Sequence, residues 1–323
     1  MNRIAVLGSA TMDFIVRQPR LPRPGETMVG SGFSIEPGGS GLNQAVAAAR
    51  LGAAVDLVGM VGADPHGDQV RGLLVSEGIR DDGLEGSSKP TGTTHVAVVD
   101  SGENSIVVVP GATADLTSLS VAQRAVIAAA AFLVLQCGLP VAVLAEGLFV
   151  ARAAGVFTVL IPEPAVALPD GFLALVDLIV PGRLEAAHLT GESDPVRAAE
   201  VLSAGGRWAI VTLGAEGSVV AFDGAVLGLA PSRPVRVVDR DAAGDTFVGA
   251  LVARLAAGAP RAAAARAAAA GAAPLPPGGT AGITEAEMID AVRWATVAAS
   301  VSVTRRGTTA AMPTLAEVAA ILA

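Results

Sequence analysis

The chain has 323 residues, of which 52% are apolar, and its net charge is −8. This length suits one large α/β domain or two smaller ones, and the apolar fraction suffices for a sizeable core. Lys89 is the only lysine and no basic block occurs, which excludes a nucleic-acid partner, because a phosphate backbone is held by several clustered cations. Cys137 is the only cysteine, so an internal disulfide and a cysteine metal cluster are also excluded.

The N-terminal segment 1–17 has a short apolar run that Asp13 interrupts. It predicts a first strand rather than a signal peptide, and we expect a cytoplasmic protein. The uncharged stretch Ala125–Ala145 is the best candidate for a membrane span, but polar and helix-breaking residues interrupt it at 136–140. We therefore expect a helix end, a buried strand, a turn and the next helix there, with no membrane partner.

Short apolar runs alternate with helical stretches through much of the chain. We expect buried strands at Ile4–Gly8, Val55–Gly62, Ala131–Gln136, Phe157–Ile161, Asp177–Val180 and Ala209–Leu213. Helical spacing marks segments between most of them, including Asn43–Leu51, Gln69–Glu77 and Val141–Ala154. This alternation predicts an α/β fold with a mostly parallel sheet covered on both faces.

Two segments, Phe14–Ile35 and Thr93–Gly111, break this alternation. The first contains the turn-rich run RQPRLPRPGE, and the second reads as two strands, THVAVVD and NSIVVVP, joined by SGEN as a hairpin. We expect them to form a small sheet over one edge of a single domain that spans residues 1–323. A lid made of segments 14–35 and 93–111 is the functional interpretation, and an ordinary β appendage is the alternative.

The stretch Arg261–Gly282 is of low complexity and rich in Ala, Gly and Pro. Its first half, RAAAARAAAA, has high helix propensity, whereas GAAPLPPGGTAG predicts a mobile loop. Thr284 and Glu287 have the spacing of a capping box, so we expect helical structure to resume there and to run towards Val303.

Several familiar chemical motifs are absent from the sequence. There is no GxxxxGK[ST], and the SSKPTG setting of Lys89 does not suit a P-loop or protein-kinase lysine. Gly8 alone follows the first strand, so the dinucleotide fingerprint GxGxxG is missing. His66, His95 and His188 lack metal-ligand spacing. Any anionic ligand must therefore be held mostly by backbone amides, a few arginines or a metal ion.

The segment Val237–Leu251, VVDRDAAGDTFVGAL, carries the strongest chemical signal. A strand-like VRVVD leads through small residues into an amphipathic helix. Ala242, Ala243 and Gly244 have almost no side chain, so an anion can approach their N–H groups where the helix dipole favours negative charge. Asp245 in the first turn then suits a catalytic base beside a phosphoryl group. The alternative is that Asp245 only caps the helix.

A second glycine-rich segment lies at Glu36–Gly67. Gly38, Gly39 and Gly41 allow a tight turn and the close approach of a ligand, and Asn43 offers both a donor and an acceptor. The small residues that follow allow a helix to pack closely on the sheet. Taken alone, such a loop is also compatible with a simple turn.

Together these segments resemble the signature regions of the ribokinase-like (PfkB) carbohydrate kinases. The resemblance covers nearly the whole chain in the same order, and its wording is closest to the ribokinase branch. It rests on GSATMD, GGSGLNQAVAAARLGA, GADPHG, PEPAVALPDGFLALVDLIVP, LEAAHLTG, VTLGAEG, VVDRDAAGDTF and VTRRGTTAAMP. It implies a three-layer α/β/α fold with a mostly parallel central sheet, and a small β-sheet lid that often pairs two subunits as a homodimer.

The resemblance also implies roles for individual residues. Asp245 matches the catalytic base, and Ala242, Ala243 and Gly244 match the anion hole. The implied substrate-binding set is Asp13, Gly39, Ser40, Gly41, Asn43 and Asp245.

Ligands of the nucleotide and of metal ions are implied in the same way. The implied nucleotide-binding set is Thr212, Gly214, Gly217 and Gly244. Glu185 matches a glutamate that organises Mg²⁺ through water. The loop pair that holds a monovalent cation such as K⁺ matches Asp239 and the backbone of Asp241 on one side and the backbone of Arg305–Gly307 on the other.

The chain departs from the family pattern at four positions. Ser40 replaces a lysine, and Gly182 replaces the asparagine of NxxE. Gly138, in QCGLP, aligns with a glutamate that binds sugar, and Ile161 replaces an asparagine. The parts used in phosphoryl transfer are mostly kept, whereas the parts that bind substrate and organise metal are altered.

The resemblance implies ATP-dependent phosphorylation of a sugar hydroxyl, with Mg²⁺ as the metal and K⁺ as an activator. D-ribose, converted to ribose 5-phosphate, is the first expected acceptor. A nucleoside, fructose or a keto-deoxy sugar acid is an alternative acceptor because of Ser40 and Gly138. A non-catalytic sugar- or nucleotide-binding homologue is the other alternative, which Gly182 and the insertion favour and the intact AAGD motif opposes.

Overall fold

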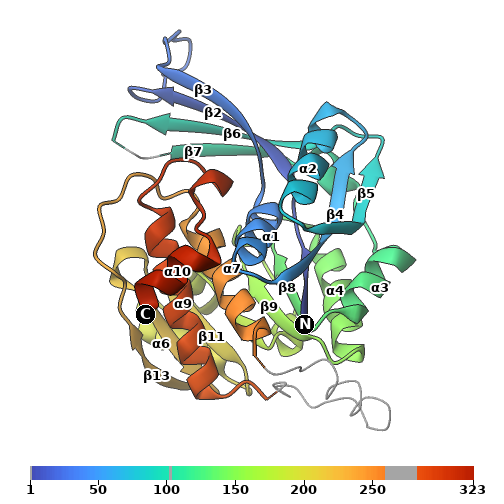
Figure 1. The fold of residues 1–323 in the computed structure, drawn as a ribbon, viewed down its shortest axis with the longest axis vertical. Coiled ribbons are helices and arrows are strands. Elements are labelled where there is room, and N and C mark those ends of the chain that lie inside the picture. The colour runs from blue at the N-terminus through green and yellow to red at the C-terminus, as the bar shows by residue number, and fades with distance from the viewer. Residues whose placement is uncertain (1, 102–103, 259–281) are drawn as a thin grey trace.

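The computed structural model describes residues 2–101, 104–258 and 282–323. Its strands form a nine-stranded sheet in the order β13-β12-β11-β10-β9-β8-β1-β4-β5 and a four-stranded sheet in the order β3-β2-β6-β7 (Figure 1). The large sheet consists of β1 (Arg3–Leu7), β4 (Ala54–Gly62), β5 (Arg80–Ser87), β8 (Phe132–Gln136), β9 (Phe157–Ile161), β10 (Leu178–Ile179), β11 (Trp208–Thr212), β12 (Ser218–Phe222) and β13 (Ala225–Ala230). The small sheet consists of β2 (Thr11–Gln18), β3 (Gly32–Gly38), β6 (Gly92–Val99) and β7 (Asn104–Val109).

Helices connect most of these strands. The α-helices are α1 (Ser40–Arg50), α2 (Pro65–Ser76), α3 (Val121–Ala129), α4 (Val141–Ala153), α5 (Arg183–Thr190), α6 (Pro195–Ser203), α7 (Ala243–Ala256), α9 (Glu285–Ser302) and α10 (Leu315–Leu322). Short 3-10 turns lie at η1 (Gly111–Asp115), η2 (Phe172–Leu175), η3 (Gly214–Glu216) and η4 (Thr309–Ala311). None of the helices in the described ranges is long and apolar enough to cross a membrane.

The large sheet is mostly parallel, which confirms the predicted α/β fold. Strands β5, β4, β1, β8, β9, β10 and β11 pair in parallel, and only β12 and β13 run antiparallel at one edge. The six strands expected from their apolar runs are β1, β4, β8, β9, β10 and β11. In β8 and β9 every residue is buried, because helices cover both faces of a parallel sheet.

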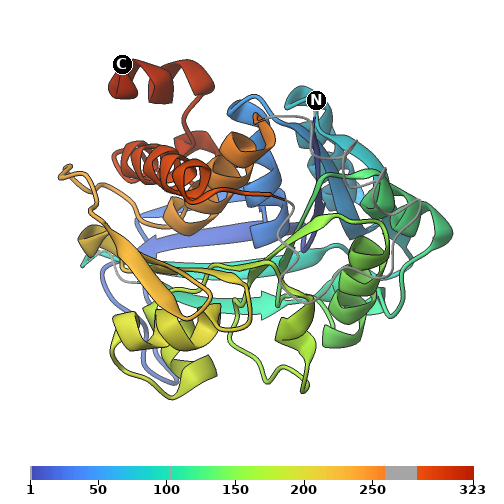
Figure 2. The same cartoon turned by 90° about the horizontal axis from the view of Figure 1, so that it is seen from below.

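Helices cover both faces of the large sheet (Figure 2), and a hydrophobic core lies on each face. One core joins the sheet to α1, α7, α9 and α10, with Leu251 and Met288 fully buried. The other joins it to α3, α4, α5 and α6, with Leu144 and Ala198 fully buried. The stretch at 125–145, weighed above as a membrane span, forms the end of α3, then β8 and the start of α4. The chain therefore has the predicted three layers.

The small sheet projects from the carboxyl end of the large one (Figure 1). Strands β6 and β7 pair antiparallel, which confirms the predicted hairpin, although residues 102 and 103 of its turn lie outside the described residues. Strand β2 pairs antiparallel with β3 and parallel with β6. Residues 14–35 and 93–111 therefore contribute to one sheet, as expected.

One local prediction is wrong. The VRVVD run at 235–239 is not a strand. The N–H groups of Val238 and Asp239 both donate to the carbonyl oxygen of Val303, at 2.7 and 3.2 Å, and the Val237 and Val238 side chains are exposed. The segment is therefore an irregular loop that lies beside the C-terminal end of α9.

Helix α9 begins where the capping box predicted it. Thr284 and Glu287 form a capping box at the start of α9, in which each side chain accepts a hydrogen bond from the other residue's backbone N–H. Most of the low-complexity stretch 261–282, with its expected helix and mobile loop, lies outside the described residues.

Candidate functional site

Asp245 lies in the first turn of α7, and the backbone before it forms a tight turn. Ala242 is buried, while Gly244 is exposed. Among the three amides predicted to be unpaired, that of Ala243 donates to the carbonyl oxygen of Arg240 at 3.1 Å, which corrects the expectation for this residue. No acceptor among the described residues is found for the N–H of Ala242, Gly244 or Asp245. Two of the three predicted amides are therefore free donors at this helix start, and that of Asp245 is a further one.

The N-terminus of α1 faces α7 across a very short distance. A Cβ atom at Gly249 of α7 would lie 2.5 Å from Ala47 Cβ and 2.8 Å from Gln44 O, so the two backbones touch. Gly41 makes a similar approach to the end of β1, where its Cβ would lie 2.7 Å from Gly8 Cα. Small residues therefore bring α1 against both the sheet and α7, as the sequence predicted for this helix.

The Asp245 carboxylate accepts two hydrogen bonds from neighbouring residues of α1. Asn43 Nδ2 donates to Oδ2 at 3.0 Å, and Gln44 Nε2 donates to Oδ1 at 2.9 Å. Burial raises the pKa of Asp245 from 3.8 to about 7, against the lowering effect of these two bonds. The nearby carboxylates of Glu163 and Asp13 raise this pKa further. A carboxyl group with a pKa near neutrality suits a general base.

Asp13, on β2, is a second buried carboxylate at the same site. Burial raises its pKa to about 6, although hydrogen bonds from Thr94 and Thr11 lower it. Gly38 lies directly against it, since a Cβ there would come within 1.9 Å of Asp13 Oδ2. The glycine at position 38 is therefore needed to leave room for the carboxylate, which is a more specific role than the flexible turn inferred from sequence.

Two further predicted substrate residues frame this space. Gly39 is the N-cap of α1 with φ +95°, a conformation that favours glycine, and its Cβ would lie 2.9 Å from the carbonyl oxygen of Ser9. Ser40 is the first residue of α1 and is half-buried. The structure thus gathers residues 13, 39–43 and 245 around one point at the carboxyl ends of the parallel strands.

The predicted nucleotide loop follows β11. Thr212 ends the strand and forms a parallel bridge with Gly182, so the two adjacent loops are aligned. Gly214 and Gly217 both have positive φ, and a Cβ at Gly217 would lie 2.0 Å from Ala230 O. These glycines permit a tight turn of η3 against β13, at the same edge of the sheet as Asp245.

Glu185 lies in the first turn of α5, and its carboxylate folds back over Gly182. A Cβ at Gly182 would come within 2.5 Å of Glu185 Oε2, so the glycine that replaces the family's asparagine makes room for this conformation. Burial and the charge of Glu185 raise the pKa of Glu163. Two carboxylates that repel each other in this way favour a cation between or near them.

The residues present fit a water-mediated Mg²⁺ site. No group of three or more acidic or histidine ligands close enough to hold a metal directly occurs in the described part of the chain. Mg²⁺ usually keeps several waters and is bound through one or two carboxylates together with substrate phosphates. Glu185 and Glu163 supply two such carboxylates.

The predicted monovalent-cation loops meet at Asp239. Its Oδ1 accepts the N–H of Asp241 at 3.2 Å and its Oδ2 accepts the N–H of Gly307 at 3.2 Å. The side chain of Arg305 forms an ion pair with Glu317 instead. Asp239 therefore joins the two loops, while the Arg305 side chain takes no part in this contact.

The small sheet contacts the same loop. Asn104, the first residue of β7, donates from Nδ2 to Asp241 Oδ1 at 2.8 Å. Arg17 of β2 lies 4.0 Å from Asp239 Oδ2. The far ends of β2 and β7 are thus tied to the loop that leads into α7, four residues or more before Asp245.

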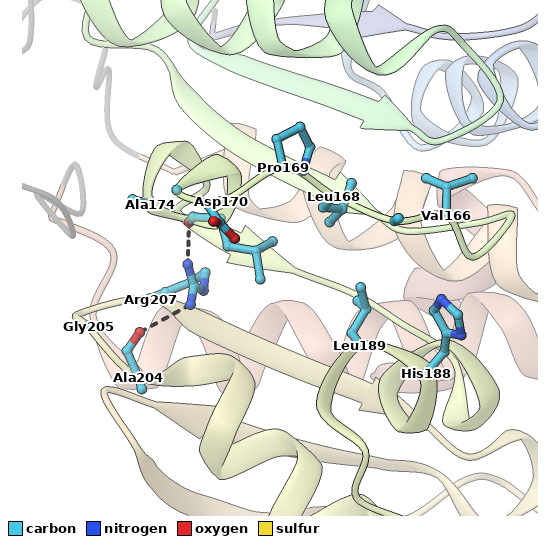
Figure 3. A pocket seen from close by; sticks show the side chains of 13 residues that line it. Val166, Leu168, Pro169, Asp170, Ala174, His188, Leu189, Ala204, Gly205 and Arg207 are labelled. Atoms are coloured by element: carbon cyan, nitrogen blue, oxygen red, sulfur yellow. Dashed lines mark hydrogen bonds between the residues drawn. The ribbon is translucent and has the colours of Figure 1, made fainter.

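A separate pocket of about 520 Å³ lies between the 166–174 loop, α5 and the turn after α6 (Figure 3). The Arg207 guanidinium donates hydrogen bonds to the carbonyl oxygens of Leu173 and Ala204. The other residues that line it are Val166, Ala167, Leu168, Pro169, Asp170, Gly171, Ala174, His188, Leu189 and Gly205. None of the predicted site residues lines this pocket.

Sequence reasoning missed several residues of the site. Gln44 follows the predicted Asn43 and was not singled out, and Gln136 was read only as an interruption of an apolar run. Glu163 stands in the motif PEPAVALPDG but received no role. Asn104 carried no signal, since its contact with Asp241 spans 137 residues of sequence. Polar residues at the ends of buried strands were the only available indication for Gln136 and Glu163.

Comparison with known proteins gives consistent results. The model of the "pfkB family carbohydrate kinase" matches residues 1–275. Ribokinase from Haemophilus influenzae is 34% identical over 322 residues, covering 97% of this chain and 96% of that protein. Arabidopsis thaliana ribokinase complexed with ribose and ATP has a TM-score of 0.83 at 26% identity, with 99% and 98% of the chains covered. Fructokinase from Xylella fastidiosa with bound ATP has a TM-score of 0.76 at 27% identity, with 99% and 98% covered.

Proposed function

The chain belongs to the pfkB family of carbohydrate kinases, and on that premise we propose that it transfers the γ-phosphoryl group of ATP to the primary hydroxyl of D-ribose. The observation that carries the proposal is the placement of Asp245. Its carboxylate has a pKa near neutrality, and the free N–H groups of Gly244 and Asp245 begin the same helix. A base and an anion site therefore lie within one helical turn.

The proposed reaction uses these groups in one step. Asp245 accepts the proton of the acceptor hydroxyl while the hydroxyl oxygen attacks the γ-phosphorus. The bond from the phosphorus to the bridging oxygen breaks, and ADP leaves with that oxygen. The amides of Gly244 and Asp245 stabilise the charge on the phosphoryl oxygens. Asp245 then releases its proton to solvent.

Acceptor hydroxyls would be bound on the other side of the base. Asp13 and Asn43 present hydrogen-bonding groups near Asp245, and Gly38 and Gly39 keep the loop close. When bound, Mg²⁺ would neutralise charge on the phosphate oxygens, and Glu185 and Glu163 would hold it through water. The nucleotide itself would lie along the 212–217 loop.

An ADP-release assay tests the proposal. Pentoses, hexoses, sugar acids and nucleosides are each supplied with ATP and Mg²⁺, and we expect D-ribose to give the highest kcat/KM. Asp245→Asn is the matched control, because it keeps the shape of the side chain and removes the base. Binding of ATP and Mg²⁺ without phosphorylation of any acceptor in the panel would instead support a non-catalytic binding homologue. A second prediction is faster turnover in K⁺ than in Na⁺, and equal rates would contradict a cation site at Asp239.

A specific feature favours an alternative acceptor, which is a nucleoside, fructose or a keto-deoxy sugar acid. Position 138, where a sugar-binding glutamate is expected by resemblance, is a glycine, and the nearest atom to a Cβ built there is Ser9 Oγ at 3.6 Å. The space beside the acceptor site is therefore open and lacks a carboxylate. A higher kcat/KM for any of these three acceptors than for ribose would establish this alternative.

We further propose that two copies of the chain associate through the small sheet, which acts as a lid. Strand β7 is an edge strand in which all six residues are exposed, including Ile106, Val107 and Val108. An exposed apolar edge strand favours pairing with another chain. Light scattering after size exclusion should give a dimer, and Ile106→Asp should give a monomer. A monomeric wild-type protein would contradict this proposal.

A further inference from the structure

Two buried glutamines lie behind the proposed base in a single hydrogen-bonded chain. Gln44 Nε2 donates to Asp245 Oδ1 at 2.9 Å, and Gln136 Nε2 donates to Gln44 Oε1 at 2.6 Å. Gln44 is 2% exposed and Gln136 is 1% exposed. The three residues come from α1, β8 and α7, so the chain crosses from the central sheet to the helix that carries the base.

The direction of this chain follows from the chemistry of its end group. An ionised carboxylate only accepts hydrogen bonds, so the atom of Gln44 that faces Asp245 must be its nitrogen. The oxygen of Gln44 then faces Gln136, which must donate. Both amides are thereby fixed in one orientation, and their dipoles point the same way along the chain.

The chain ends at an atom with no partner. Gln136 Oε1 is buried and has no hydrogen-bond partner among the described residues. A Cβ at Gly8 would lie 2.0 Å from this oxygen, so the glycine that follows β1 leaves the space that Gln136 occupies. Burying an unpaired carbonyl oxygen is unfavourable. Among the described residues, the hydrogen bond that holds this amide is therefore the one that its nitrogen donates to Gln44.

We infer that Gln136, acting through Gln44, is a positioning residue that holds the Asp245 carboxylate in the orientation needed to accept the acceptor's proton. This inference deepens the proposed function and rests on it. Gln44 anchors Oδ1 and Asn43 anchors Oδ2, so rotation of the carboxylate about its Cβ–Cγ bond is prevented. Each oxygen keeps a further lone pair that is available to a hydroxyl.

The same bonds act on the titration of the base. Gln44 and Asn43 stabilise the charged form, whereas burial and the carboxylates of Glu163 and Asp13 oppose it. These are the charged and hydrogen-bonding groups that reach Asp245 from α1, β2 and the loop after β9. Loss of the Gln44 donor should therefore raise the pKa of the base, and loss of Gln136 should do so to a smaller extent.

The test compares the pH dependence of kcat in four proteins. Gln44→Met should move the acidic limb of the profile to higher pH by about one unit and lower kcat at pH 7 about tenfold. Gln136→Met should move the limb in the same direction by roughly half as much. The KM for ATP should stay unchanged in both. Because Gln136 acts through Gln44, the double variant should match Gln44→Met alone.

Gln123 provides a matched control. It is also a fully buried glutamine, but its amide donates to the carbonyl oxygens of Gly59 and Gly83, away from Asp245. Gln123→Met should lower thermal stability and leave the pH profile in place. A Gln136→Met profile that keeps its acidic limb, as this control does, would overturn the inference. Additive effects in the double variant would overturn it as well.

Two provisions keep the test decisive. If Gln136→Met does not fold, Gln136→Asn replaces it, since a side chain shortened by one methylene cannot reach Gln44. If the wild-type protein phosphorylates no acceptor, the proposed function fails by itself. The hydrogen-bonded chain is then tested by ¹³C NMR of labelled aspartate carboxylates, which measures the pKa of Asp245. The resonance of Asp245 is identified by its loss in Asp245→Asn. An unchanged titration of Asp245 in Gln44→Met would overturn the inference.

Discussion

Removing the charge of Asp245 should make the folded protein more stable while abolishing its activity. Burial raises the pKa of this carboxyl from 3.8 to about 7 in the folded protein. Between these two values the folded protein binds a proton that the unfolded chain has released. The free energy of unfolding therefore falls as the pH rises from about 4 to about 7. Asp245→Asn has no charge to bury and escapes this loss.

The magnitude follows from the two pKa values. At 1.36 kcal/mol per pKa unit, the destabilisation by Asp245 grows from about 0.5 kcal/mol at pH 4 to about 4 kcal/mol at pH 8. This is an upper bound, because the side chain is partly exposed. The new amide has hydrogen-bond partners for both of its polar atoms. Its oxygen accepts from Gln44. Its nitrogen donates to Asn43 Oδ1, an atom without a partner in the described structure, once the Asn43 amide has flipped.

Thermal unfolding followed from pH 4 to pH 8 measures this effect. For a chain of this length, about 4 kcal/mol corresponds to a rise in Tm of about 6 °C, so the advantage of Asp245→Asn should appear at pH 8 and nearly vanish at pH 4. In the same protein kcat should fall at least a hundredfold, with ATP binding retained. A Tm difference independent of pH, or a kcat above about a tenth of the wild-type value, would refute this reasoning.

Three other perturbations have defined outcomes. Gly38→Ala places a Cβ 1.9 Å from Asp13 Oδ2, so the KM for the acceptor should rise about tenfold or more with the KM for ATP unchanged; an acceptor KM within twofold of wild type would remove Asp13 from the acceptor site. Asn104→Ala removes the bond from β7 to Asp241, and the KM for the acceptor should rise about fivefold, whereas no change would show that this contact does not hold the small sheet. Cys137 is buried and its thiol pKa is raised to about 11, so a maleimide at pH 7 should label it only on unfolding; rapid labelling of the native protein would contradict this.

The sequence predicts the large sheet well because its strands are buried on both faces. Runs such as Phe132–Gln136 and Phe157–Ile161 are continuous, β-branched or aromatic, and bounded by turn residues, which is how strands of a parallel sheet read. The run at 235–239 has similar residues but is not a strand. No strand lies beside this run to pair with it, and its N–H groups donate to the carbonyl oxygen of Val303 instead.

The site was predicted only in part, because local patterns do not carry long-range contacts. Resemblance selected Asn43 and Asp245, and the structure joins them by a hydrogen bond. The bonds of Gln44 to Asp245 and to Gln136 span 201 and 92 residues of sequence, and only the order of the strands brings these residues together. The pairing of the Ala243 amide likewise depends on the turn at Arg240, which the letters AAGD do not specify.

Asp13 stands on β2, a strand of the small sheet, while Asp245 stands on a helix packed against the large one. Any movement of the small sheet therefore carries one carboxylate of the site towards or away from the other. An acceptor that contacts both carboxylates would therefore hold the small sheet against the large one. A molecule as small as water would contact only one of them and would leave the two sheets without this link.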